Sequence, residues 1–231
     1  MTDFWMRKLI RDYDNAEDSR VRGAVGTLSG AVGIGCNLLL FALKLAAGIL
    51  AGSVSVTADA LNNLSDASGS IVTLLGFRLA GKPADEHHPF GHARFEYLAG
   101  LAVAVTVMVI GMELGKTSVE KILEPVAVRL SAVTLLILAV SVAVKLWLWR
   151  FNIRLGRHIG SQALLATAAD SRNDCIATAA VLAAALIEGI WDLRVDGLMG
   201  LAVALFIMRR GWDLAKQTVS PLLGENADPE L

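Results

Sequence analysis

Charge is scarce in this sequence, and neither sign is in surplus. Charged residues make up 19% of the 231 positions, hydrophobic residues 55%, and the formal net charge is −1 at pH 7. A mean hydropathy of +0.55 is too apolar for an ordinary soluble domain and is typical of membrane proteins. Because there is no basic surplus, the chain lacks the electrostatic footprint of a nucleic-acid-binding protein.

Cysteine and histidine are also rare. Cys36 and Cys175 both fall inside apolar stretches, which favours packing roles over a disulfide or a zinc clip. The four histidines all lie outside those stretches, so a metal site inside the membrane would have no imidazole ligand: His87, His88, His92 and His158. The first 22 residues are polar and lack the apolar core of a signal peptide, which predicts a retained cytoplasmic tail.

Six stretches are long enough to cross a bilayer, which takes about 20 helical residues. We predict an all-α membrane protein, a bundle of six transmembrane helices at 27–50, 54–79, 95–117, 130–150, 161–188 and 195–212. Residues 23–215 would form the six-helix transmembrane domain, following the 1–22 tail. Lys44 and Lys145 interrupt otherwise uncharged span centres.

The distribution of Lys and Arg predicts the orientation, because cytoplasmic loops carry an excess of both. Fourteen flank one side: Arg7, Lys8, Arg11, Arg20, Arg22, Arg78, Lys82, Arg94, Arg150, Arg154, Arg157, Arg209, Arg210 and Lys216. Four flank the other: Lys116, Lys121, Arg129 and Arg194. Both termini are therefore expected in the cytoplasm.

Two polar pairs stand four residues apart within the second and fifth spans. Asn62 with Asp66, and Asp170 with Asp174, each share one helix face. At 1.5 Å per residue, Asp66 lies roughly 18 Å deep from outside, and Asp170 and Asp174 roughly 14 and 20 Å from the cytoplasm. The pairs can therefore meet near mid-depth. An Asp at the bilayer centre costs roughly 3 kcal/mol, so we expect these oxygens to bind a divalent cation.

The alternative is that the polar groups only hold helices together by hydrogen bonds, although three Asp and one Asn matched in depth favour the cation. An all-oxygen site suits Mn²⁺, while Zn²⁺, Fe²⁺, Cd²⁺ and Co²⁺ stay open as cargo. Since ligating carboxylates must be ionised, metal and proton would compete for the site. A faint echo between 60–66 and 168–174 also fits the inverted repeats of transporters.

Two further sets of residues have two readings each. Asp59, seven residues before Asp66, either lines the outward half of a path or is an acid near a helix end that reaches for water. In the loop after the second span, Asp85, His88 and His92 surround Pro89 and Gly91. That loop either coordinates a second divalent ion or is a solvated turn.

The sequence resembles the cation diffusion facilitator family over nearly its whole length. The resemblance rests on Asp59, Asn62 and Asp66, on 88–92 with Arg94, Glu96 and Tyr97, and on Asp170 with Asp174. It implies a six-helix homodimer in the cell membrane that exports divalent cations in exchange for protons. It also implies that Asn62, Asp66, Asp170 and Asp174 form the transport site, and that Asp85, His88 and His92 match a second site.

Two departures from the family pattern are informative. Members that transport zinc usually carry His in one or both helix pairs, so Asn-Asp with Asp-Asp is similar to the manganese-exporting branch. Members also usually continue into a cytoplasmic metal-binding α/β domain. Residues 216–231 resemble the start of the linker to it, and we expect that domain to be absent; a shortened chain and a naturally short protein both fit this ending.

Two other classes of function compete with the exporter. A membrane-embedded, metal-dependent phosphotransferase also uses Asp-x-x-x-Asp helices, but that chemistry needs further acids and an Arg to hold phosphates near the metal. No such cluster surrounds Asp66 or Asp170 in the sequence. A cation channel would pass metal downhill without proton coupling. The exporter, which is not an enzyme, is the leading hypothesis.

Overall fold

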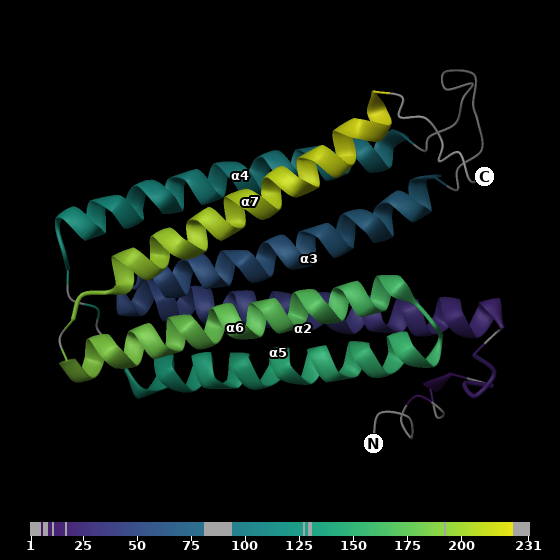
Figure 1. The fold of residues 1–231 in the computed structure, drawn as a ribbon, viewed down its shortest axis with the longest axis horizontal. Coiled ribbons are helices and arrows are strands. Elements are labelled where there is room, and N and C mark those ends of the chain that lie inside the picture. Colours follow the sequence, from purple (N-terminus) through teal and green to yellow (C-terminus); the bar gives the residue numbers. More distant parts are fainter. Residues whose placement is uncertain are drawn as a thin grey trace.

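The computed structural model describes residues 6, 9–10, 12–16, 18–80, 94–126, 128, 131–191 and 193–223, with the backbone alone for some of them, including 69–80 and 94–97. Over these residues the fold is helical (Figure 1). The long helices are α2 (Ser19–Ala51), α3 (Val54–Ala80), α4 (Arg94–Leu123), α5 (Ala132–His158), α6 (Gln162–Trp191) and α7 (Asp196–Leu222). Each contains one of the six predicted spans, almost completely, which confirms the predicted helical membrane bundle.

Several helices run past their predicted spans, because their ends are set by caps and not by hydropathy. α2 begins eight residues early, behind Asp18, whose carboxylate accepts a hydrogen bond from the Arg20 amide at 2.8 Å. It stops at Gly52, which takes a left-handed φ of 64° that few other residues adopt. α7 continues to Leu222, ten residues beyond the expected end. That extension places Arg210 inside a helix and not at its end.

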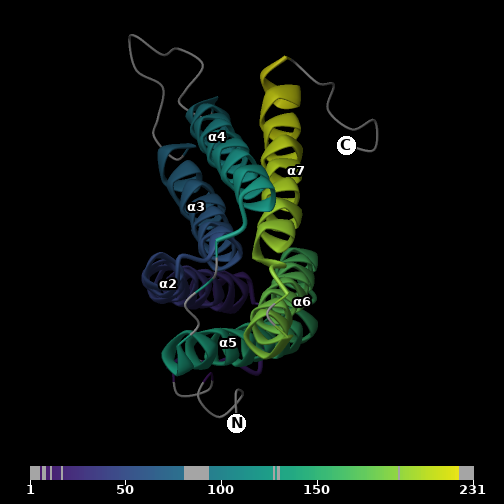
Figure 2. The same ribbon diagram turned by 90° about the vertical axis from the view of Figure 1, so that its left-hand side faces the viewer.

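The helices form two layers (Figures 1 and 2). One layer holds α3, α4 and α7, and the other holds α2, α5 and α6. α4 packs along α7, α5 along α6, and α2 against α3, whereas α6 meets α3 and α7 over short stretches only. The beginning of α2 and the end of α7 lie at the same end of the bundle (Figure 1), which we call the terminal end.

Glycines allow α4 and α7 to approach closely. A Cβ on Gly211 would lie 2.7 Å from Met108 Cγ, and one on Gly111 would lie 2.6 Å from Met208 Cγ. Small residues at such crossings let membrane helices pack backbone to backbone. α4 and α7 are therefore held together as one unit.

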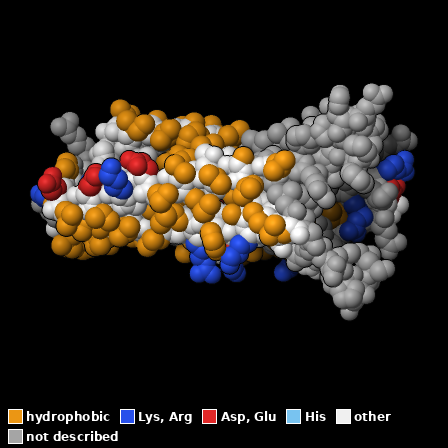
Figure 3. Space-filling model, turned by 90° about the horizontal axis from the view of Figure 1, so that it is seen from above, with side chains coloured by type: hydrophobic (Ala, Val, Ile, Leu, Met, Phe, Trp, Pro, Cys, Tyr) orange, Lys and Arg blue, Asp and Glu red, His pale blue; other side chains and the backbone are white. Residues whose placement is uncertain are grey.

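Apolar side chains cover the outside of the bundle as well as its interior. Leu138, Val181 and Ile207 are buried in the central core, whereas Leu50, Leu136 and Leu205 are exposed. Figure 3, which looks onto α4 and α7, shows hydrophobic side chains over the middle of that face. Among the described residues, α2, α4, α5 and α6 are long and apolar enough to cross a membrane on that basis alone. α3 and α7 are not among them, and both carry polar and charged side chains within their apolar stretches.

At the end opposite the terminal end, one carboxylate joins several helices. Asp196, the first residue of α7, accepts hydrogen bonds from the Ser53 and Ser55 hydroxyls, both at 2.5 Å, and from the Val54 amide at 2.8 Å. Lys121 of α4 lies 2.7 Å from it. Asp196 thereby caps the start of α3, whose first amides have no partner within the helix. The contacts close this end of the bundle.

We predict that Asp196→Ala lowers the unfolding free energy by about 2 kcal/mol, because it removes a helix cap and leaves the partly buried Lys121 ammonium without its carboxylate. The apparent Tm of the purified protein in detergent checks this. Asp213→Ala, which removes a half-exposed acid from the same helix, serves as the control and should change the Tm little. Equal Tm values for the two variants would show that the Asp196 network is not stabilising.

Candidate functional site

The two polar pairs face each other where α3 meets α6. Asn62 Nδ2 of α3 donates a hydrogen bond to Asp174 Oδ1 of α6 at 3.1 Å. Both residues are buried, with 1% and 2% of their surface exposed. Asp66, one turn after Asn62 on the same face, lies beside them and is also largely buried. Asn62, Asp66 and Asp174 therefore converge from two helices that are far apart in the sequence.

A lysine from a third helix reaches these carboxylates. Lys145 of α5 places its ammonium 2.7 Å from Asp174 Oδ2 and 3.1 Å from Asp66 Oδ2. It also donates to Asn37 Oδ1 of α2 at 2.8 Å. Only 1% of its side chain is exposed. An ammonium this deep is stabilised only by such partners, since a buried charge without one is strongly unfavourable.

An arginine from a fourth helix contacts all four of the predicted ligands. Arg210 of α7 donates to Asp66 Oδ1 at 2.5 Å, to Asp174 Oδ1 at 3.2 Å and to Asn62 Oδ1 at 3.4 Å. Its other terminal nitrogen donates to Asp170 Oδ1 at 3.2 Å. Asp170 sits at the rim of the site, with 62% of its side chain exposed. The guanidinium links this outer acid to the three inner groups.

The carboxylates of the site contact the side chains of Lys145 and Arg210. Within the described part of the chain, no three His, Cys, Asp or Glu side chains lie close enough to share one metal ion. Asp66 and Asp174 each present one oxygen to Lys145 and the other to Arg210. Binding of a divalent cation by these groups thus requires a shift of the acids and of at least one basic side chain.

Sequence reasoning did not predict a role for Arg210 or for Lys145. Lys145 was visible as a charge in the middle of an apolar span, which is a signal of a buried partner. Arg210 was counted among the charges that flank the sixth span, because the apolar stretch ends near residue 212. α7 continues to Leu222, so Arg210 lies well inside the helix, and the face that α7 turns toward α3 and α6 brings this side chain to the site.

Comparison with known proteins identifies the family. The family model of the cation efflux transmembrane domain matches residues 31–223. The chain belongs to this family. Its members are transporters and not enzymes, so the enzyme alternative is not supported.

Curated relatives match over most of the chain. The manganese efflux system protein MneS of Bacillus subtilis is 34% identical over 204 residues, which is 87% of this chain and 68% of that protein. An uncharacterized transporter of Methanocaldococcus jannaschii is 31% identical over 188 residues, covering 81% and 66%. The magnetosome protein MamB of Magnetospirillum gryphiswaldense is 30% identical over 184 residues, covering 80% and 62%. The chain thus spans about two thirds of the length of these relatives.

Asp59 forms a second buried ion pair, separate from the first site. Lys44 of α2 lies 2.8 Å from Asp59 Oδ2, and both side chains are fully buried. Thr178 of α6 donates to Asp59 at 3.1 Å and accepts from Lys44 at 3.0 Å. Asp59 therefore does not reach for water as a helix-end acid would. Its placement on an ion path stays a prediction.

Of the other residues singled out from the sequence, some lie in the part of the chain that the structure describes and some do not. Asp85, His88 and His92, the predicted loop site, lie outside the described residues. Cys36 and Cys175 are free thiols.

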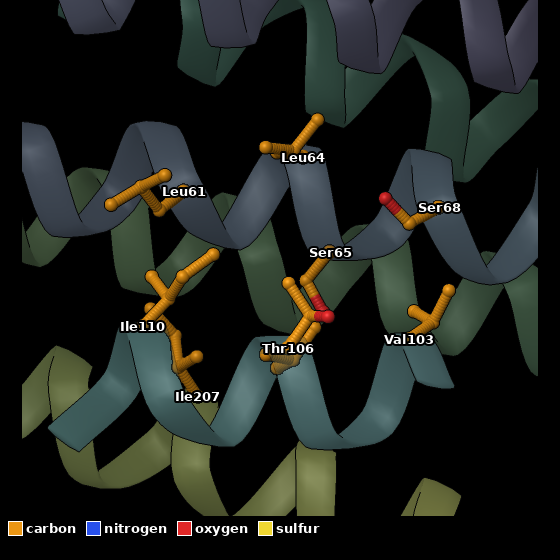
Figure 4. A pocket seen from close by; sticks show the side chains of 9 residues that line it. Leu61, Leu64, Ser65, Ser68, Val103, Thr106, Ile110 and Ile207 are labelled. Atoms are coloured by element: carbon orange, nitrogen blue, oxygen red, sulfur yellow. The ribbon is translucent and has the colours of Figure 1, made fainter. Parts of the chain in front are cut away.

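Two cavities lie near the site. One of about 470 Å³ lies between α2, α5 and α6 and extends from Arg22 and Ser161 at the terminal end to Asn37, the partner of Lys145. The other, of about 100 Å³, lies between α3, α4 and α7 (Figure 4). Figure 4 shows Leu61, Ser65 and Ser68 of α3 across from Thr106 of α4. No Asp or Glu is among the described residues that line these two cavities.

We predict that Lys44 and Asp59 act as a structural pair. Asp59→Asn should lower the unfolding free energy by about 3 kcal/mol, because it leaves the Lys44 ammonium buried and unpaired. The apparent Tm should fall accordingly. The double variant Lys44→Met with Asp59→Leu, which removes both charges, should recover most of that loss. Thermal unfolding of the three proteins in detergent measures the coupling. Loss of cation export by Asp59→Asn at unchanged Tm would instead place Asp59 on the ion path.

Proposed function

We propose that this chain exports a divalent cation, Mn²⁺ foremost, in exchange for protons. The observation that carries the proposal is the convergence of Asn62, Asp66 and Asp174 between α3 and α6, with Asp170 joined to them through Arg210. These four side chains form the transport site of the proposal. Their side-chain oxygens would be the ligands, from two helices that contact each other over a short stretch only.

The ligand chemistry favours manganese. Carboxylate and amide oxygens suit hard ions such as Mn²⁺, whereas zinc is bound preferentially by nitrogen and sulfur. Two Bacillus subtilis relatives, MneS and MneP, are manganese efflux system proteins, at 34% and 29% identity. Another relative is a cation-efflux pump, FieF of Pectobacterium atrosepticum, at 29% identity. Zn²⁺ and Fe²⁺ are the next candidates, because carboxylates bind them too.

Proton exchange follows from the same oxygens. Carboxylates must be ionised to ligate a metal, so a cation that arrives displaces protons and protons that arrive weaken cation binding. A carrier that alternates between its two sides would then move metal one way and protons the other. A channel has no such requirement, and proton movement therefore separates the two mechanisms.

The orientation proposed for the chain puts the terminal end in the cytoplasm, in accordance with the excess of Lys and Arg there. The Asp196 network then closes the outer end of the bundle. The 470 Å³ cavity, which begins beside Arg22, lies on the cytoplasmic side. We further propose a homodimer and a second cation site at Asp85, His88 and His92, both on the family resemblance.

In proteoliposomes, an outward Mn²⁺ gradient should drive protons in the opposite direction. Asp174→Asn should reduce both fluxes to the level of protein-free vesicles, because it removes an anionic ligand from the buried centre of the site. Asp213→Asn, a half-exposed acid on α7, should leave both unchanged. A pH-sensitive dye and a Mn²⁺-quenched dye inside the vesicles report the two fluxes. Mn²⁺ flux without proton movement would contradict antiport, and full flux in Asp174→Asn would contradict the site.

Asn62→His should shift the preference from Mn²⁺ toward Zn²⁺ by at least severalfold. It adds an imidazole ligand, which Zn²⁺ binds better than Mn²⁺ does. The ratio of Zn²⁺ to Mn²⁺ uptake into vesicles measures this. Asn173→His, which places the same group on an exposed position of α6, is the matched control and should keep the original ratio. An unchanged ratio in Asn62→His would show that Asn62 does not set selectivity.

A further inference from the structure

We infer that Arg210 is a tethered cation that occupies the transport site in the absence of metal, and that an incoming divalent cation must expel its guanidinium. The inference rests on the proposed function, since it assigns a role to a residue that touches the proposed ligands without being one. Arg210 thereby sets both the affinity for metal and the position of α7.

The guanidinium lies where the metal ion would need to bind. It contacts Oδ1 of Asn62, Asp66, Asp170 and Asp174, the same four side chains that would ligate the cation. A metal ion and a guanidinium both bind carboxylates by charge, and they cannot share the same oxygens at contact distance. Occupation by one therefore excludes the other.

Lys145 differs from Arg210 in position and in access. It contacts Oδ2 of Asp66 and of Asp174, on the other side of these carboxylates, and is almost completely enclosed. The Arg210 side chain keeps 22% of its surface exposed. It extends from a long flexible stem past the ring of Phe206, whose centroid lies 5.3 Å from the guanidinium carbon. The ring thus contacts the guanidinium while the acids hold it. Because part of its side chain is exposed, Arg210 has room to move outward, whereas the enclosed Lys145 stays with the acids.

The charges favour this exchange. With the side chains in their ordinary ionised forms, three carboxylates face one ammonium and one guanidinium, which leaves one negative charge. A divalent cation in place of the guanidinium makes the group neutral, provided that Lys145 remains. Neutrality lowers the cost of holding the site between membrane helices. When no metal ion is bound, Arg210 also provides a second positive charge. Without it, three carboxylates would have Lys145 as their one neighbouring cation among the described contacts.

Expulsion of Arg210 also changes how the helices are connected. The predicted ligands come from α3 and α6, and α7 reaches them through Arg210. α7 is fixed to α4 by the close glycine contacts at Gly111 and Gly211. Elsewhere, α6 and α7 meet only over a short stretch. Since α3 packs directly against α4 and α7, replacement of the guanidinium by a metal ion would mainly remove the ionic link between α7 and α6.

Calorimetry with Mn²⁺ tests the competition. If the guanidinium fills the site nine-tenths of the time, it weakens the apparent affinity about tenfold. Arg210→Met, which keeps the apolar stem, should therefore bind Mn²⁺ about tenfold more tightly than the unchanged protein. Arg209→Met removes the same charge from the neighbouring position, where 82% of the side chain is exposed, and should leave the Kd unchanged. An equal or weaker affinity in Arg210→Met would overturn the inference.

Arginine-specific labelling tests the same point in the unchanged protein, in case Arg210→Met does not fold. Phenylglyoxal modification, read by mass spectrometry, should increase severalfold at Arg210 when Mn²⁺ is added, and stay constant at Arg209. Unchanged or reduced labelling of Arg210 in Mn²⁺-saturated protein would show that the guanidinium is not expelled.

The two experiments separate this inference from the proposed function. If the unchanged protein binds Mn²⁺ and Asp174→Asn does not, the transport site stands, and the Arg210 results alone decide on the tethered cation. If the unchanged protein binds no Mn²⁺, the manganese site and the tethered cation both fail.

Discussion

Carboxylates that lie between membrane-spanning helices need positive charge close by, because neither lipid nor the apolar interior can solvate them. This constraint organises the centre of the bundle. Asp66 and Asp174 are enclosed between α3 and α6, and two basic side chains from other helices, Lys145 and Arg210, complete their surroundings. Four helices therefore meet at one electrostatic centre, although the direct contacts of α6 with α3 and α7 are short.

The same constraint appears at two other levels of the bundle. Lys44 and Asp59 neutralise each other inside it, and Lys121 and Asp196 do so at the end opposite the terminal end. These two pairs have hydroxyl or amide partners that complete their hydrogen bonding, as in Thr178 beside Asp59. The central group instead has one acid, Asp170, at an exposed rim. The enclosed pairs Lys44–Asp59 and Lys121–Asp196 are therefore suited to a structural role, whereas the central group, which has an exposed acid, is suited to exchange of ions.

The packing of the helices allows such exchange to act on the whole molecule. α4 and α7 are joined by close backbone contact at Gly111 and Gly211, so a force on α7 is passed to α4. α5 and α6 form the other long pair. A cation held by α3 and α6 in place of Arg210 would alter the connection between these units. In a transporter, this links occupancy of the site to the position of the helices around it.

The sequence by itself determined the membrane class, the six helices, the spacing of Asn62 with Asp66 and of Asp170 with Asp174, and the family resemblance. These follow from hydropathy and from helical periodicity, which are local properties. Only the tertiary structure decided that Arg210 and Lys145 lie among the acids, that Asp59 is enclosed by Lys44, and that Asp196 caps α3. Hydropathy gives the length of the apolar part of α7 but not where its helix ends, and pairings between distant helices depend on how their faces turn in the bundle.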